Sequence, residues 1–193
     1  MKEWKASIAY DSKNTIRLSK TLQNTFHFWQ KVLLMAFSVV VAAAGLAVGA
    51  NTPEGLLMLA LGCIMLMNTD MSARARARHT LSQLRGYIPR MEYTFGETSF
   101  RGMTDREDNT FSYSTIIRLV DDKKFLYLFQ NQESAFMVDK ATVEPKGCRE
   151  LKEHIAKQVG LQWTYPGNLL NTGLVTLITN RINTRKNRDV KKK

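Results

Sequence analysis

Two apolar runs joined by a short polar link dominate the sequence. The first run, Val32 to Ala50, contains no ionisable residue, and Ser38 is its one clearly polar side chain. Its length matches the roughly 20 apolar helical residues that cross the hydrocarbon core of a bilayer. The alternative is a buried helix of a soluble protein, but such a helix usually has a polar side, whereas this run is apolar all round. The run therefore predicts a membrane-spanning helix.

The second run, Gly55 to Met67, is shorter and follows a link that contains Pro53. Counted from Pro53, with Arg74 reaching back toward the headgroups, this run is also long enough to cross. A cleaved signal peptide is not expected, because about thirty polar residues precede the first run. The sequence thus predicts a transmembrane helical hairpin over residues 32–72.

Small residues recur along one face of the first predicted helix. Gly45 and Gly49 lie four residues apart, and Ala42 lies one turn earlier. Such a face lets a second helix backbone approach closely. The expected partner is the second helix near Gly62, and association of two copies of the chain is the alternative.

Lysine and arginine are unevenly distributed around the hairpin. Residues 1–31 contain six of them and residues 72–90 contain five, whereas the link contains none. Positive flanks stay on the cytoplasmic side, so both termini are predicted to be cytoplasmic and the link to lie outside. The net charge of the chain is +11, yet residues 91–180 hold ten basic and twelve acidic residues. This distribution favours the anionic inner leaflet as a partner and argues against nucleic acid.

Residues 1–31 are expected to form a cytoplasmic segment with a short strand near residues 5–10 and an amphipathic helix. Residues 73–90 are expected to form a basic juxtamembrane helix along the inner leaflet. Aromatic side chains beside the membrane prefer the headgroup level. The predicted interfacial aromatic residues are Phe26, Phe28, Trp29, Trp163 and Tyr165. The predicted basic residues of the membrane surface are Arg74, Arg76, Arg78, Arg85, Arg181, Arg185, Lys186, Arg188, Lys191, Lys192 and Lys193.

From Met91 the hydrophobic period changes from helical spacing to alternation. Short strands separated by turn-rich segments indicate an antiparallel meander. A helix follows with Leu151 and Ile155 on one face, and Gly160 is its stop signal. We therefore predict an α+β membrane protein, with the hairpin joined to an antiparallel PH-like β-barrel that a C-terminal helix caps over residues 91–160. The expected strands are 91–95, 98–103, 110–114, 116–120, 125–129 and 135–138.

These strands also resemble a known family. The segments Tyr93-Thr-Phe95, Phe111-Ser-Tyr-Ser-Thr-Ile116, Phe125-Leu-Tyr-Leu128 and Ala135-Phe-Met-Val-Asp-Lys140 are similar to those of YcxB-like bacterial membrane proteins. The resemblance implies a PH-like domain anchored in the bacterial cytoplasmic membrane by two transmembrane helices, and it supplies no catalytic residue. The chain departs from the family at Asp139, where a proline commonly precedes the lysine, and in the segment after Gly160.

Residues 161–193 form this extra segment. Leu169 to Ile182 give a wide apolar helical face, and a polybasic tail follows. An apolar helix with a polybasic end is typical of a segment that lies on the inner leaflet. The alternatives are a helix that docks on the β domain and a solvated tail.

Motifs of catalysis or metal binding are not found in the sequence. The three histidines lie in different regions, and neither Cys63 nor Cys148 has the spacing of a zinc site. We expect no enzyme, no metal and no cofactor. The predicted function is a membrane-anchored interaction module that presents its PH-like domain to a protein partner. Lipid binding by that domain is less favoured, because Lys123 and Lys124 lie beside two aspartates. The alternatives are an accessory or immunity-type membrane protein that acts through its hairpin, and a small transporter component.

Overall fold

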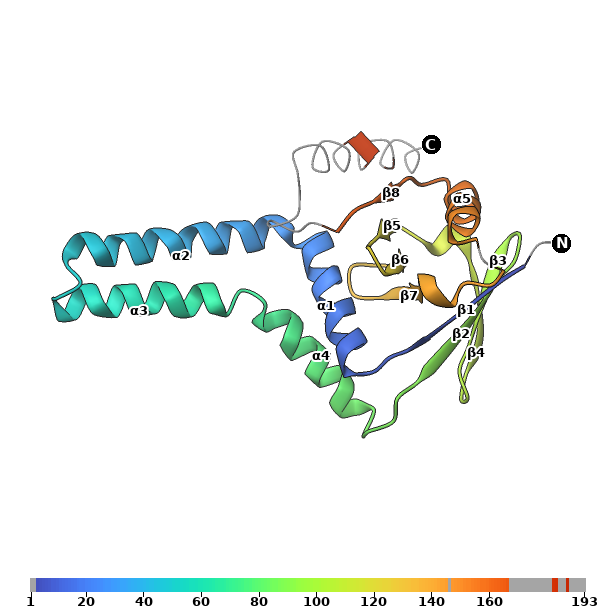
Figure 1. Ribbon diagram of the computed structural model, residues 1–193, viewed down its shortest axis with the longest axis horizontal. Coiled ribbons are helices and arrows are strands. Elements are labelled where there is room, and N and C mark those ends of the chain that lie inside the picture. Colours follow the sequence, from blue (N-terminus) through green and yellow to red (C-terminus); the bar gives the residue numbers. More distant parts are fainter. Residues whose placement is uncertain (1–2, 146, 167–181, 184–186, 188–193) are drawn as a thin grey trace.

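The computed structural model describes residues 3–145, 147–166, 182–183 and 187 (Figure 1). These residues have an α+β architecture, with two four-stranded sheets and a helical hairpin that projects from one side. The helices are α1 (Ser12–Phe26), α2 (Phe28–Val48), α3 (Pro53–Met67), α4 (Met71–Gln83) and α5 (Cys148–Val159), and the 3-10 turns are η1 (Tyr113–Thr115) and η2 (Lys140–Thr142). The strands are β1 (Trp4–Ala9), β2 (Arg90–Phe95), β3 (Ser99–Met103), β4 (Asp108–Ser112), β5 (Arg118–Asp121), β6 (Phe125–Phe129), β7 (Ala135–Asp139) and β8 (Trp163–Thr164).

Helix α2 is the one described helix that is, by itself, long and apolar enough to cross a membrane. Its 21 residues extend about 31 Å at 1.5 Å per residue. Helix α3 has 15 residues and extends about 22 Å, which is less than the roughly 30 Å of a hydrocarbon core. Helices α3 and α4 pass the same test only as a pair, and they are bent by 48° at the break between them. The second crossing therefore stays a prediction.

The two helices of the hairpin lie side by side at small residues (Figure 1). A Cβ added at Gly62 would lie 2.7 Å from the Ala42 nitrogen, and one added at Gly45 would lie 2.7 Å from the Gly55 oxygen. The backbones are therefore in direct contact. The turn uses Gly49, whose φ of +114° favours glycine. Thr52 is the N-cap of α3, and its hydroxyl accepts a hydrogen bond from the Gly55 N–H.

The hairpin is inserted between two neighbouring strands of one sheet. The strand order in this sheet, sheet A, is β1-β2-β3-β4. Strand β1 precedes the hairpin and β2 follows it, yet the two pair antiparallel from Trp4 opposite Phe95 to Ala9 opposite Arg90. The β domain therefore includes β1, whereas the predicted domain covered only residues 91–160. The pairing was not expected because about eighty residues separate the two strands.

Sheet B has the order β7-β6-β5-β8, and its central strand β6 is buried along its whole length. Helix α1 covers one face of this sheet, where the Phe26 ring meets the Phe129 ring edge-on at 5.3 Å. The other face packs on sheet A, where the Phe136 ring meets the Phe100 ring at 4.9 Å. No strand pairing joins the two sheets in the described chain, so the predicted closed barrel is not confirmed.

Helix α5 packs against the same core, with Leu151 and Ile155 fully buried. The apolar positions of the predicted strands are buried in the same core, apart from Phe111, which is half-buried. The buried ones include Phe95, Ile116, Leu119, Phe125 and Leu128.

The hairpin meets the β domain at an ionic cluster. Asp70, between α3 and α4, lies 2.9 Å from the Lys20 nitrogen and 2.5 Å from the Lys31 nitrogen. Because these lysines come from α1 and α2, one carboxylate joins three parts of the chain. Helix α4 packs on α1 through its small buried side chains, Ala73 and Ala77.

Candidate functional site

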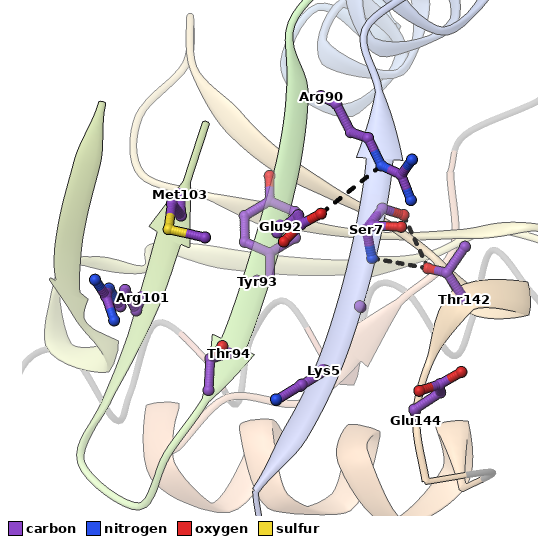
Figure 2. A pocket seen from close by; sticks show the side chains of 11 residues that line it. Lys5, Ser7, Arg90, Glu92, Tyr93, Thr94, Arg101, Met103, Thr142 and Glu144 are labelled. Carbon is purple, nitrogen blue, oxygen red and sulfur yellow. Dashed lines mark hydrogen bonds and ion pairs between the residues drawn. The ribbon is translucent and has the colours of Figure 1, made fainter. Parts of the chain in front are cut away.

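A polar groove lies on the outer face of sheet A. Side chains alternate along these strands, so that Trp4, Ala6 and Ile8 of β1 enter the core while Lys5 and Ser7 lie on the other side. The groove has a volume of about 580 Å³ (Figure 2). It is lined by Lys5, Ala6, Ser7, Arg90, Glu92, Tyr93, Thr94, Arg101, Met103, Thr142 and Glu144.

The segment after β7 forms one wall of the groove and closes the free edge of β1. The Lys5 N–H donates to the Glu144 oxygen at 2.7 Å, and the Glu144 N–H donates to the Lys5 oxygen at 2.8 Å. Ser7, two residues after Lys5 in β1, bonds to the same segment. The Thr142 hydroxyl accepts from the Ser7 N–H at 2.9 Å and donates to the Ser7 oxygen at 2.8 Å. The wall is therefore fixed to β1 by four hydrogen bonds, and the groove is preformed.

Charges of both signs line the groove. Lys5, Arg90 and Arg101 are cationic, and Glu92 and Glu144 are anionic. The Arg90 and Glu92 side chains are 3.9 Å apart and exposed to solvent, so they form only a weak pair. Arg90 and Glu92 therefore remain available to a ligand that carries charges of both signs.

Arg101 is held by an ion pair with a neighbouring strand. Its Nε donates to an Asp108 carboxylate oxygen at 2.6 Å, and its terminal nitrogen donates to the other oxygen. This bidentate contact raises the pKa of Arg101 and lowers the pKa of Asp108. The pair fixes the guanidinium beside the groove at neutral pH.

A second hollow of about 390 Å³ continues the groove toward the end of α4, since both are lined by Arg90, Glu92 and Met103. Its lining includes Ile88 and Met103, whose side chains are 58% and 40% exposed. The Arg106 guanidinium lies 4.1 Å from the centre of the Tyr87 ring at the same end. The groove therefore has a polar part and an apolar end.

Buried phenols lie behind the groove. The Tyr93 and Tyr10 hydroxyl oxygens are 3.1 Å apart, and the Met137 N–H donates to the Tyr10 hydroxyl. Burial raises the pKa of Tyr10, and it raises the pKa of Tyr93 well above its usual value. Both phenols are neutral at physiological pH and serve as hydrogen-bonded packing. The lining of the groove therefore offers charged groups and hydrogen bonds to a ligand.

Comparison with known families adds one finding. Residues 95–154 match the YcxB-like protein family model. The match confirms the family resemblance over the part of the chain that runs from the end of β2 into α5. Neither curated proteins nor solved structures give a significant match.

The matched residues supply only part of the groove. The YcxB-like region contributes Arg101, Met103, Thr142 and Glu144, and the other lining residues come from β1 and from earlier positions of β2. None of the side chains that line the groove is among the predicted site residues. The alternation in the first strand was a usable signal, but the groove exists only because β1 pairs across the inserted hairpin.

The predicted aromatic residues lie in different environments. The Phe26 ring packs on the Phe129 ring, and the Trp163 indole N–H donates to the Lys152 oxygen at 3.0 Å. Trp29, at the start of α2, is 74% exposed, and Phe28 contacts its ring edge-on. Tyr165 is exposed. Of the five predicted interfacial aromatic residues, Trp29 is thus the one that is highly exposed and lies in a helix of the hairpin.

The predicted basic residues divide between described and undescribed parts of the chain. Arg74, Arg76 and Arg78 are exposed along α4, and Arg85 is exposed just beyond it. Ala42, Gly45 and Gly62 lie at the contact between α2 and α3. The proposed membrane-lying face of 169–178 falls outside the described residues, as do Arg181, Arg185, Lys186, Arg188, Lys191, Lys192 and Lys193.

Among the residues that the structure describes, no three His, Cys, Asp or Glu side chains form a metal-binding group.

Proposed function

We propose that this protein is a membrane-anchored interaction module of the bacterial cytoplasmic membrane. The helical hairpin holds the YcxB-like domain at the cytoplasmic face, and the groove on sheet A receives a segment of a protein partner. The domain is PH-like in outline, with a four-stranded sheet packed on a second sheet and a helix after the last long strand.

The distribution of exposed apolar side chains carries the proposal of an anchor. Of the nineteen large hydrophobic side chains that are exposed in the described chain, fourteen lie between residues 29 and 71. The other five are scattered over the rest of the chain. A soluble protein rarely exposes so extended an apolar surface, because its contact with water is unfavourable. Lipid acyl chains are the natural environment of this hairpin.

The basic flanks support the orientation. Arg74, Arg76 and Arg78 are exposed in the helix that leaves the hairpin, close to where anionic headgroups of the inner leaflet would lie. In this arrangement α3 completes the second crossing together with the turn before α4, and both termini are cytoplasmic.

The position and charge of the groove support a protein partner. Sheet A lies at the far side of the domain from the hairpin, with sheet B and α1 between them (Figure 1). A headgroup of the anchoring bilayer is therefore remote from the groove. The mixture of acidic and basic side chains suits a peptide better than a phosphorylated headgroup, which would need a mainly basic pocket.

Site-specific photo-crosslinking in living cells tests the groove. A photoreactive residue at Thr94, which lines the groove, is expected to give a discrete protein adduct. The same residue at Gln158, an exposed position of α5, is the matched control and should not give that adduct. Lys5→Glu should reduce the Thr94 adduct about two- to fivefold, as expected for one exposed charge contact. Identical adducts from both positions, or none from Thr94, would contradict the proposed site.

A further inference from the structure

Strand β8 is an edge strand whose outer side is occupied. It pairs in parallel with β5, from Leu119 opposite Trp163 to Val120 opposite Thr164. The Thr164 hydroxyl also donates to the Leu119 oxygen at 2.8 Å. Since β8 ends the strand order of sheet B, its other side would present free backbone groups. Such an edge is a template for pairing with another chain.

Two asparagines near the C-terminus bond to the backbone of Trp163, in β8, and of Gln162, just before it. The Gln162 N–H donates to the Asn187 Oδ1 at 2.9 Å, and the Asn187 Nδ2 donates to the Gln162 oxygen at 3.2 Å. The Asn183 Nδ2 donates to the Trp163 oxygen at 2.9 Å. One amide side chain thus satisfies both the donor and the acceptor of Gln162, as a residue of a neighbouring strand would.

The two asparagines bond to consecutive residues of the chain. Asn183 and Asn187 both have helical backbone conformation, and their targets are Trp163, the first residue of β8, and Gln162, the residue before it. An asparagine fits this role because its amide offers a donor and an acceptor on a short side chain.

We propose that the edge of β8 is a docking surface for a later part of this same chain, and that Asn183 and Asn187 are the positioning residues that hold it there. The occupant is the part of the chain that carries Ile182, Asn183 and Asn187. In this arrangement the segment binds the YcxB-like domain and does not lie on the inner leaflet. The docked segment also blocks the edge of β8 against strands of other chains.

Hydrogen exchange of the full chain in nanodiscs tests the docking. The nanodiscs contain phosphatidylethanolamine with the anionic lipid phosphatidylglycerol, so that the bilayer competes for the basic segment. The Gln162 amide is expected to exchange slowly in the wild type. Asn187→Ala should increase its exchange rate about tenfold, because the one contact that the structure gives this N–H is lost. Asn109→Ala, at an exposed position of β4, is the control and should leave the rate unchanged.

Two further readouts separate docking from general unfolding. Asn187→Asp keeps an oxygen that accepts from the Gln162 N–H, so this variant should protect that amide better than Asn187→Ala does. The amides of β6 in the core should remain protected in every variant. The proposal is overturned if the wild-type Gln162 amide exchanges as fast as an unfolded one, because the bilayer or solvent then holds the segment. It is equally overturned if Asn187→Ala leaves the rate unchanged.

Discussion

Leu128→Ala is expected to lower the free energy of unfolding by roughly 2–5 kcal/mol, the usual cost of such a truncation in a well-packed core. Leu128 is fully buried in β6, the strand of sheet B that lies between β5 and β7. Its removal leaves a cavity in a layer covered by structure on both sides, so little relaxation is available. Denaturant titration of the detergent-solubilised chain, followed by tryptophan fluorescence, measures the change; Trp4 is a buried reporter.

Met103→Ala is the matched control for this core substitution. Met103 is 40% exposed on the outer face of sheet A, so its truncation should change the free energy of unfolding by no more than about 0.5 kcal/mol. Equal losses for Leu128→Ala and Met103→Ala would show that β6 is not the centre of the core.

Gly62→Leu is expected to separate the two helices of the hairpin. Even a Cβ at this position would lie 2.7 Å from the Ala42 nitrogen and 2.8 Å from the Ser38 oxygen. These are backbone atoms, so relief requires a shift of a whole helix and not of one side chain. Overpacking of this kind costs about 1–3 kcal/mol or more. Thermal unfolding in detergent, followed by circular dichroism, should shift downward by about 2–4 °C per kcal/mol.

Ala60→Leu adds the same side chain to the same helix at an exposed position. It should leave the thermal midpoint close to that of the wild type. If Ala60→Leu lowers the midpoint as much as Gly62→Leu does, close packing at Gly62 does not hold the hairpin together.

Local patterns predicted the elements with strong periodicity. The uninterrupted apolar run from Val32 to Ala50 lies mostly in α2. This helix could be predicted because an all-apolar run is recognised without knowledge of distant residues. The strands from β2 to β7 were predicted within a few residues, since aromatic and β-branched side chains between polar turns are a local signal. Helix α5 was predicted from its apolar face and from Gly160, which has a left-handed conformation after the last helical residue.

Tertiary relationships were harder to predict. The pairing of β1 with β2 crosses the whole hairpin, and no local pattern specifies such a distant partner. The closed barrel was expected from a run of consecutive strands, but η1 interrupts them between β4 and β5. There the Ser112 hydroxyl accepts from the Ser114 N–H and turns the chain out of sheet A. Sheet B then starts as a separate sheet.

The groove could not be predicted for the same reason. Lys5, Arg101 and Glu144 are far apart in the sequence and carry ordinary surface charges. They meet because β1 returns to the sheet and the segment after β7 closes its edge. The edge contact of Asn187 with Gln162 likewise depends on sheet topology, since asparagine in a polar, basic tail gives no signal by itself.

Thiol labelling in intact cells tests the central claim that a membrane hairpin holds the domain in the cytoplasm. Single cysteines replace Asn51, in the turn of the hairpin, and Gln132, between β6 and β7, after Cys63 and Cys148 are changed to serine. Both positions are exposed, and Asn51 spares the Thr52 hydroxyl that caps α3. An impermeant reagent should label Asn51→Cys from outside and should label Gln132→Cys only after the cells are opened. Labelling of Gln132→Cys in intact cells, or failure to label Asn51→Cys there, would contradict the account.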